Sequence, residues 1–594
     1  MRFALKKLAI TAVALAVPTL AFGQFWPQWM VNPQHTGTPG VTGQNLTHIL
    51  ASVTYDGTIA SELAATGGDL LAHYQVPLVD GNRVFMEFKT GTLDPNTVDF
   101  ADLTWGERGF QWQSGTLVQV WSYTSDWKAP GSLFDFWEPV FHAVLANGAV
   151  YMPGASGSII KVNATTGAFI ARISPFGTDP DTYEAGPITV DGNGNLYYNA
   201  VQQIGISADH EFFKLGRDVT DSWLVKVTPG GVATTASYKT LLAGIAPPAT
   251  GTACLGTFAI SQLPWPPSSS AVPPNVICGT TRVALNIAPA LAPDGTIYSV
   301  ARAHLNSRYP FLVAINPNLT LKWASSMRER FDDGCGVPVS SGGVFPANGS
   351  PGGCNAGANF NVDPATNRRP GGRVLDDSSS TPAVGPDGSI FYGAYSRYNY
   401  AQGHMMKWDK DGNYKGTYLF GWDETPAIVV GQNTNCGGNN TTCYALVIKD
   451  NHYGGVGSYC NDETICPAER TATNPAYPTA LYISQIDNNM NLLWRFLSTQ
   501  HDSCTRQPNG NITCELNTHP EGFEWCVNGH SVDQNGVVYA NSEDGFLYAI
   551  NQGGTLKQRI FQQLALGAAY TPTSMGSDGK IYSQNAGILF VVGN

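Results

Sequence analysis

The residues best suited to chemistry gather between residues 501 and 530. The histidines and carboxylates there are His501, Asp502, His519, Glu521, Glu524 and His530. Histidine titrates near neutral pH, so a histidine beside a carboxylate can bind Zn²⁺ or act as acid and base. The stretch lacks the rigid HExxH spacing of helical zinc sites, and a polar loop held by disulfides explains the same residues. We expect such a loop; the catalytic candidates that remain, for a lyase or hydrolase, are His519, Glu521, Glu524 and His530.

The cysteines favour disulfides. All 11 lie between Cys254 and Cys526, and no CxxC pair or CxxCH haem-attachment motif occurs among them. Pairing nearest neighbours predicts Cys254–Cys278, Cys335–Cys354, Cys436–Cys443 and Cys460–Cys466, and leaves Cys504, Cys514 and Cys526 to form one more bond and one free thiol. Other pairings stay open, because spacing alone does not determine connectivity.

The first 23 residues are typical of a bacterial secretory signal, with a basic start followed by an apolar run over residues 8–21. That run is shorter than the roughly 20 residues that cross a bilayer, and it contains Pro18. We therefore predict a mature chain that starts at Gln24 and has no membrane span. Its home is the periplasm or the cell exterior, where disulfides persist.

The composition favours a β protein rich in turns. Of the 594 residues, 65 are Gly and 38 are Pro, while 43% are hydrophobic and 13% charged. This apolar content excludes a disordered chain, and the Gly and Pro content is typical of many turns. Acidic residues outnumber basic ones by 45 to 33, and no basic stretch suits a phosphate backbone. Nucleic acid is therefore excluded as a partner.

A short motif recurs along the chain. The pattern Gly, any residue, aliphatic, aromatic starts at Gly148, Gly194, Gly295, Gly388, Gly536 and Gly579, with a looser copy at Gly81. Asp or Asn usually precedes the Gly, which is the turn chemistry of a tight hairpin. A further hairpin follows most copies, as in residues 311–323. Four antiparallel strands per repeat predict the blades of a β-propeller.

Counting the repeats predicts eight blades. They lie near residues 70–125, 137–175, 183–241, 284–327, 376–420, 424–498, 526–563 and from 568 onward. The eighth ends at Asn594 after only three strands, and the apolar segment 48–55 is the donor we expect for the fourth. Pairing the two ends of the chain closes the ring and removes exposed sheet edges. Seven blades is the alternative if the first repeat is irregular.

The mature chain is expected to form one propeller domain over residues 24–594 with long insertions. These cover residues 242–283, 328–375, 436–478 and 499–525, and they hold every cysteine except Cys526. Disulfides there would tie down loops that have no core of their own.

Several segments resemble the PQQ-like (pyrroloquinoline-quinone-like) β-propeller family. The opening Trp26-Pro-Gln-Trp29 resembles the start of many members. The turn at residues 162–167 and the patterns ending in Trp323 and Trp494 are similar to the tryptophan-docking repeat of the family. The resemblance implies either a scaffold without cofactor or a quinoprotein dehydrogenase, which holds the quinone and Ca²⁺ at the propeller axis beside an Asp base. The vicinal Cys pair of many such alcohol dehydrogenases is absent.

Three functions follow as hypotheses. The first is a monomeric binding scaffold for a small molecule, a glycan or a protein. The alternative is a dehydrogenase that uses PQQ and Ca²⁺ to oxidise an alcohol or a sugar. The third is the lyase or hydrolase that would use the residues of 501–530.

Propeller ligands usually bind where the innermost strands begin, so the residues just before those strands are the ligand-binding candidates. They are Glu138, His142, Glu184, Asn286, Asp376, Asp377, Asp423, Glu424, Asn528 and Tyr570. Carboxylates that converge on one axis suit Ca²⁺, which takes six to eight oxygen ligands. The alternative is an acidic rim satisfied by hydrogen bonds and internal water.

Overall fold

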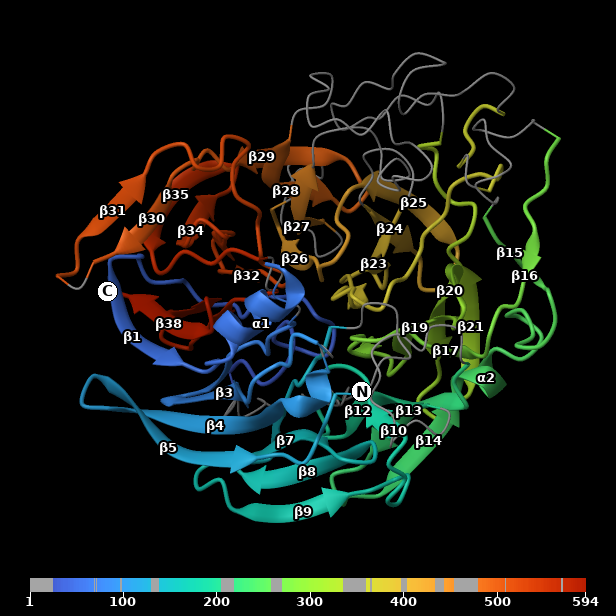
Figure 1. Ribbon diagram of the computed structural model, residues 1–594, viewed down its shortest axis with the longest axis horizontal. Coiled ribbons are helices and arrows are strands. Elements are labelled where there is room, and N and C mark those ends of the chain that lie inside the picture. Colours follow the sequence, from blue (N-terminus) through green and yellow to red (C-terminus); the bar gives the residue numbers. More distant parts are fainter. Residues whose placement is uncertain are drawn as a thin grey trace, which may run out of the picture.

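Eight antiparallel sheets form a wheel around a central axis in the computed structural model (Figure 1). The structure describes residues 25–594 except 69, 71, 97–98, 130–137, 204–217, 258–269, 335–358, 364–365, 397–402, 433–442, 453–478, 508 and 568–569. Each sheet is a blade whose strands follow the chain from the axis to the rim. The all-β, eight-bladed prediction is confirmed, and the seven-bladed alternative is wrong.

The blades keep the predicted order along the chain. Blades 1 and 2 contain β2 (Leu78–Asp80), β3 (Arg83–Thr90), β4 (Thr104–Gln113), β5 (Thr116–Thr124), β6 (Val144–Ala146), β7 (Ala149–Gly154), β8 (Ser158–Asn163) and β9 (Phe169–Ile173). In blades 3 and 4 the innermost strand is split in two. They contain β10 (Thr182–Glu184), β11 (Thr189–Val190), β12 (Leu196–Gln202), β13 (Asp221–Val227), β14 (Ala233–Ser237), β17 (Thr281–Val283), β18 (Ala290–Leu291), β19 (Ile297–Ala303), β20 (Asn306–Ile315) and β21 (Leu321–Ser326).

The second half of the wheel is built in the same way. Blades 5 and 6 contain β22 (Ala383–Val384), β23 (Ile390–Tyr395), β24 (Gly403–Trp408), β25 (Tyr414–Leu419), β26 (Ala427–Val430), β27 (Tyr444–His452), β28 (Ala480–Asp487) and β29 (Leu492–Leu497). Blades 7 and 8 contain β32 (Ser531–Val532), β33 (Val538–Asn541), β34 (Phe546–Asn551), β35 (Thr555–Phe561), β36 (Ser574–Met575), β37 (Ile581–Asn585) and β38 (Ile588–Gly593).

The two ends of the chain close the ring as predicted. β1 (His48–Thr54) is the outer strand of blade 8 and pairs antiparallel with β38, from His48 opposite Gly593 to Thr54 opposite Ile588. The closure leaves no blade without its fourth strand, so no long sheet edge is exposed at the junction.

Tryptophans join neighbouring blades. Trp323 on β21 donates its indole N–H to the carbonyl of Lys410 at 3.1 Å, across the junction between blades 4 and 5. Gly412 lies against the ring, where a Cβ would come within 2.6 Å of it. Trp121 makes the same contact with Ala164 in the next blade, at 3.0 Å. This is the docking arrangement that the family resemblance predicted.

The segment 26–44, here called the inner belt, runs around the axis and bonds to every blade. Its hydrogen-bond partners, from blade 1 to blade 8, are Val79, Leu145, Val190, Leu291, Val384, Ile428, Val532 and Gly579. Most of these residues belong to the short innermost strands, near the turns that end them. The belt therefore bonds to the wheel near those turns, while its Trp29 reaches the candidate residues that precede the strands by stacking on His142.

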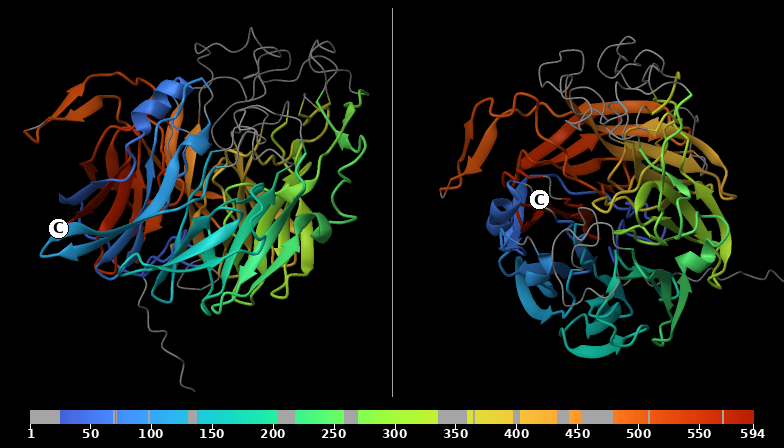
Figure 2. Two further views of the ribbon diagram at one scale, coloured as in Figure 1. Left: turned by 60° about the horizontal axis from the view of Figure 1, so that its bottom comes forward. Right: turned by 45° about the vertical axis from the view of Figure 1, so that its right-hand side comes forward.

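Several described segments of the insertions lie on one face of the wheel. Figure 2 shows β15 (Cys254–Leu255) with β16 (Asn275–Val276), the hairpin of β30 (Ser503–Arg506) and β31 (Ile512–Glu515), and α1 (Ile59–Thr66) on that face. The other helical segments among the described residues are the short α2 (Tyr238–Leu241) and the 3-10 turn Phe100–Asp102. No described helix is both long and apolar enough to cross a membrane.

Two disulfides cross-link residues within these insertions. Cys254 is bonded to Cys278, as predicted, and Cys504 is bonded to Cys514 across the β30–β31 hairpin. Cys526 is a buried free thiol, which resolves the trio left open by the sequence. Cys443 is disulfide-bonded, but the predicted partner Cys436 lies outside the described residues. The predicted pairs Cys335–Cys354 and Cys460–Cys466 lie outside them too.

Candidate functional site

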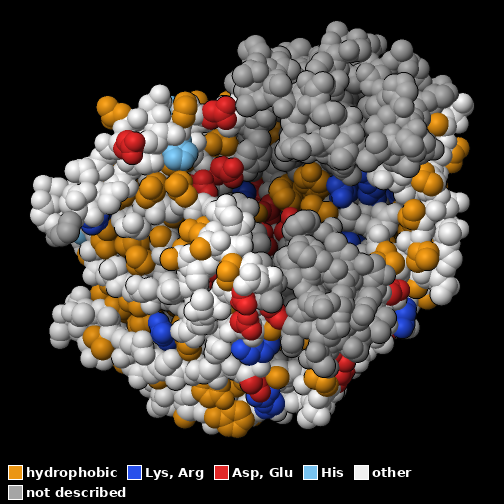
Figure 3. All heavy atoms as spheres, viewed as in Figure 1, with side chains coloured by type: hydrophobic (Ala, Val, Ile, Leu, Met, Phe, Trp, Pro, Cys, Tyr) orange, Lys and Arg blue, Asp and Glu red, His pale blue; other side chains and the backbone are white. Residues whose placement is uncertain are grey.

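The predicted ligand-binding residues lie around one end of the central channel, called here the channel mouth. Each belongs to an innermost strand or to the segment beside one. Figure 3 shows acidic side chains around a hollow near the centre of this face. The contacts below decide what each residue can do.

The first group at the mouth centres on His73, which sequence reasoning missed. Its Nε2 lies 2.5 Å from a carboxylate oxygen of Glu138, and its ring stacks on Tyr570 with centroids 4.3 Å apart. His142 donates from Nε2 to the carbonyl of His73 at 3.2 Å and stacks on Trp29. Burial lowers the pKa of His73 to about 4 and that of His142 to about 3, so both imidazoles are neutral at pH 7.

Carboxylates form the second group. Asp423 accepts hydrogen bonds from the Ser379 amide at 2.6 Å and from its hydroxyl at 2.9 Å. Burial, and then repulsion by Glu138 and Asp423, raise the pKa of Asp377 well above its usual range. A carboxyl group so placed holds its proton near neutral pH and becomes a hydrogen-bond donor.

A third group lies deeper in the channel. Glu424 accepts a hydrogen bond from the amide of Lys449 at 2.6 Å, and His530 Nδ1 lies 3.8 Å from the same carboxylate oxygen. Burial and the charge of Lys449 lower the pKa of His530 to about 3. Among the described residues, neither ring nitrogen of His530 and neither amide atom of Asn528 has a hydrogen-bond partner. Buried polar atoms of this kind face water or a ligand.

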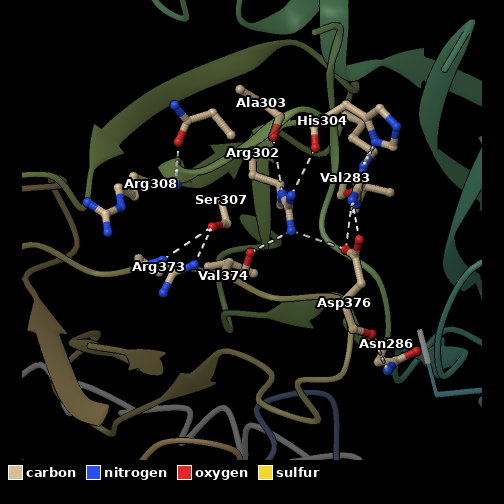
Figure 4. A network of polar contacts seen from close by, with 12 residues as sticks. Val283, Asn286, Arg302, Ala303, His304, Ser307, Arg308, Arg373, Val374 and Asp376 are labelled. Carbon is tan, nitrogen blue, oxygen red and sulfur yellow. Dashed lines mark hydrogen bonds and ion pairs between the residues drawn. The ribbon is translucent and has the colours of Figure 1, made fainter. Parts of the chain in front are cut away.

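Asp376 is committed to an ion-pair network (Figure 4). Arg282 Nη2 contacts both carboxylate oxygens at 2.7 Å, and Arg302 Nη1 lies 3.3 Å from one of them. Burial alone would raise the pKa of Asp376, but the two guanidinium groups lower it overall. Nearby, Asn286 donates to the carbonyls of Glu138 and Asp376. These bonds join blades 4 and 5, so the ionised carboxylate of Asp376 has a structural role.

Glu184 stands apart from these groups on β10. Its Oε1 accepts the amide of Gly186 at 3.2 Å, and its Oε2 has no hydrogen-bond partner in the described part of the chain. Burial raises the pKa of this carboxyl well above its usual range, so it is protonated near neutral pH.

A cavity of about 510 Å³, including its open end, lies at the mouth. Its aromatic lining residues are Phe420, Trp422, Trp525 and Tyr570, and its polar ones are Asp423, Lys449, Asn451, Glu524 and Cys526. Among the described residues, the indole nitrogens of Trp422 and Trp525 and the amide oxygen of Asn451 have no hydrogen-bond partner. We call this space the mouth cavity.

The structure separates the titratable residues of 501–530. His519 lies beside the β30–β31 hairpin, where its carbonyl is 3.1 Å from His501 Nδ1, and Glu521 accepts the hydroxyl of Thr479. Glu524 lines the mouth cavity, whereas His530 is buried in the channel. Of the four catalytic candidates, Glu524 alone lines the mouth cavity.

The channel residues do not fit the calcium and quinone of the alternative hypothesis. In the part of the chain that the structure describes, no three His, Cys, Asp or Glu side chains group closely enough to hold a metal ion. The mouth cavity sets one lysine against two carboxylates, Asp423 and Glu524. PQQ carries three carboxylates, which such a surface repels.

Comparison with known proteins finds likeness only among solved structures. No family model matches the chain, and no curated protein does. The solved structures include a europium-containing methanol dehydrogenase (11% identity, TM-score 0.46, 94% of this chain and 89% of that chain covered). They also include BamB from Moraxella catarrhalis (11% identity, TM-score 0.38, 93% and 100% covered). Likeness this distant carries no argument about function.

The architecture defines the chain as an eight-bladed β-propeller with four-stranded blades. Its docked tryptophans and closed ring agree with the resemblance to PQQ-like β-propellers that the sequence indicated.

Proposed function

We propose that the protein is an exported binding scaffold whose mouth cavity holds a small neutral ligand, with a sugar unit as the best fit. The observation that carries the proposal is the lining of that cavity. Aromatic rings such as Trp422 and Tyr570 offer flat faces for the apolar C–H side of a sugar. Polar atoms without partners among the described residues, on Trp422, Trp525 and Asn451, suit its hydroxyl groups.

The charge of the cavity lining supports a neutral ligand. Its acidic groups, Asp423 and Glu524, outnumber Lys449, so anionic sugars are disfavoured. The disulfides in the insertions are consistent with an exported protein. The periplasm or the cell exterior, reached after cleavage before Gln24, belongs to the same proposal.

Calorimetric titration with a panel of mono- and disaccharides tests the proposal. The panel contains neutral sugars, a cationic amino sugar and an anionic uronic acid. We expect saturable binding of a neutral sugar, weaker binding of the uronic acid, and a loss of about tenfold or more in Trp422→Ala. Trp112→Ala is the matched control, because Trp112 is a partly buried tryptophan outside the cavity that bonds to Tyr582.

Two outcomes decide against this function. If no neutral sugar binds, or if Trp422→Ala binds as tightly as the control, the mouth cavity is not a sugar site. Incubation with PQQ and Ca²⁺ forms a separate arm. If the protein shows the spectrum of a bound quinone and reduces a dye when alcohols are added, the scaffold proposal is wrong and the dehydrogenase hypothesis is supported.

A further inference from the structure

A second cavity, separate from the channel, is lined by an unusual number of arginines. It lies where blades 4 and 5 meet their insertions, and we call it the arginine cavity. Its five arginines are Arg308, Arg328, Arg368, Arg369 and Arg373. They come from β20, from the segment after β21 and from the segment that precedes blade 5. Figure 3 shows Lys and Arg side chains gathered on this face, and Figure 4 shows Arg308 and Arg373 beside Ser307.

The lining carries a net positive charge. Against the five arginines stand three carboxylates: Asp363 and Glu329 in the lining, and Asp332, which lies 2.6 Å from Arg369. Asp363 lies 3.4 Å from Arg308, and Glu329 lies 3.6 Å from its neighbour Arg328. Next to the cavity, Arg282 and Arg302 both contact the carboxylate of Asp376.

Aromatic rings hold two of the guanidinium groups in place. The guanidinium of Arg328 lies 3.9 Å from the ring centroid of Tyr309, and that of Arg373 lies 5.2 Å from the ring centroid of Tyr395. Arg373 also donates to the hydroxyl of Ser307 at 3.1 Å. Stacking orients a guanidinium while leaving its positive charge in place.

Backbone hydrogen bonds hold the segments that carry these arginines against each other. Gly372 donates its amide to the carbonyl of Met327 at 2.9 Å, and Arg373 donates its amide to Tyr395 at 2.8 Å. Gly371 packs so closely that a Cβ would lie 2.5 Å from the amide nitrogen of Glu329. Arg302 then anchors the carbonyl of Val374 from below at 2.7 Å. The cavity is therefore preorganised, which lowers the entropic cost of binding.

We propose that the arginine cavity binds a small oxyanion that carries more than one negative charge. The planar forks of arginine match carboxylate and phosphate oxygens in pairs, and several forks around one space favour a multivalent ligand over a monovalent one. This site is independent of the ligand of the mouth cavity.

Calorimetry at low ionic strength tests the site with three probes: citrate, pyrophosphate and acetate. We expect saturable binding of citrate or pyrophosphate, whichever class fits, and acetate at least about tenfold weaker. Affinity should fall as salt is added, because the attraction is between charges. Comparison of citrate with pyrophosphate distinguishes a carboxylate ligand from a phosphate ligand.

Substitutions locate the binding. Arg328→Gln and Arg368→Gln should each weaken the tighter probe by about tenfold, since each removes a charged donor. Arg172→Gln is the matched control: it removes an arginine from a partly exposed ion pair with Asp126 on blade 2, away from the cavity. Arg328→Lys keeps the charge but loses the fork, and should bind between wild type and Arg328→Gln.

Melting temperatures equal to that of wild type show that these variants are folded. The proposal is overturned if neither multivalent probe binds saturably, if acetate binds as tightly as citrate, or if both glutamine variants behave like Arg172→Gln. Trp525→Phe, which reduces the size of one ring in the mouth cavity, should leave anion binding unchanged.

Discussion

Gln28 pairs with Val190 as one strand pairs with another, although 162 residues separate them. The amide of Val190 donates to Gln28 Oε1 at 2.7 Å, and Gln28 Nε2 donates to the Val190 carbonyl at 3.1 Å. A side chain of the inner belt therefore completes the edge of the innermost strand of blade 3. The belt repeats such bonding on every blade, so it ties the start of the chain to the whole ring.

Gln28→Ala should lower the free energy of unfolding by about 2–4 kcal/mol, because it leaves two buried backbone groups of Val190 without partners. Urea denaturation measures the change. Gln113→Ala, at an exposed position of β4, is the control and should lie within about 0.5 kcal/mol of wild type. Equal midpoints for the two variants would show that the belt contributes no stability at this blade.

Gly412→Ala should cost more stability than Gly115→Ala. Both glycines have positive φ, 85° and 84°, so both substitutions strain the backbone by about 1–2 kcal/mol. Only at Gly412 would the new Cβ also meet the docked ring of Trp323, at 2.6 Å, whereas nothing lies within 4 Å at Gly115. Urea denaturation followed by tryptophan fluorescence compares them. An equal loss in both variants would contradict a structural role for the docked tryptophan.

Glu107→Gln should stabilise the protein at alkaline pH. Burial raises the pKa of Glu107 to about 8 from 4.5, although Gln75 donates a hydrogen bond to it at 2.9 Å. The unfolded chain therefore loses this proton above pH 4.5 while the folded chain keeps it, and stability falls as pH rises to about 8. The variant removes that fall.

Urea midpoints at pH 5 and pH 9 measure the effect of Glu107→Gln. The gain over wild type should be on the order of a few kcal/mol larger at pH 9 than at pH 5. Glu515→Gln, on the exposed β31, controls for the loss of one carboxylate. A gain that does not depend on pH would mean that Glu107 ionises normally in the folded protein.

The buried channel histidines should stay neutral at pH 5. Burial lowers the pKa of His73 to about 4 and that of His142 and His530 to about 3. Their ring ¹⁵N shifts should be those of neutral imidazole at pH 7 and at pH 5, with His530→Gln used to assign one signal. A protonated shift at pH 5 would contradict the burial of that ring.

These histidines also make the free energy of unfolding depend on pH under acidic conditions. The unfolded chain takes up protons on them as pH falls below about 6.5, and the folded chain does so only at its lowered pKa values. Their contribution to stability should therefore decrease as pH falls from about 6.5 to about 4, opposite in sign to that of Glu107. Urea midpoints of wild type and His530→Gln at pH 7 and pH 5 isolate this contribution, because wild type should lose stability relative to the variant at pH 5.

Much of the wheel was predictable from the residues alone. The Gly-x-aliphatic-aromatic repeat predicts the first hairpin of most blades, and those glycines do sit in the turns, as at Gly295 with φ 83°. The apolar segment 48–55 was recognised as the closing strand, and it pairs with β38. Cys254 with Cys278 followed from spacing. Each of these signals is local, because turn chemistry, strand alternation and short disulfide loops are written within a few dozen residues.

The channel residues were predictable in position and not in role. Residues before innermost strands must lie near the axis of any propeller, so Glu424 and Asn528 could be singled out. His73 was missed because the first repeat is the least regular, although it also precedes an innermost strand. A search for polar residues before β2 would have found it.

Only the tertiary structure decided which groups each side chain contacts. Asp376 and Asp377 are neighbours in sequence, but Asp376 forms ion pairs with Arg282 and Arg302 of blade 4. Burial and nearby carboxylates raise the pKa of Asp377, so it stays protonated. The five arginines of the second cavity come from segments up to 65 residues apart, where no spacing rule applies. Charge state and ligand affinity depend on which groups lie within a few ångströms of each other in a buried site. Closure of the propeller brings together residues that are far apart in the sequence.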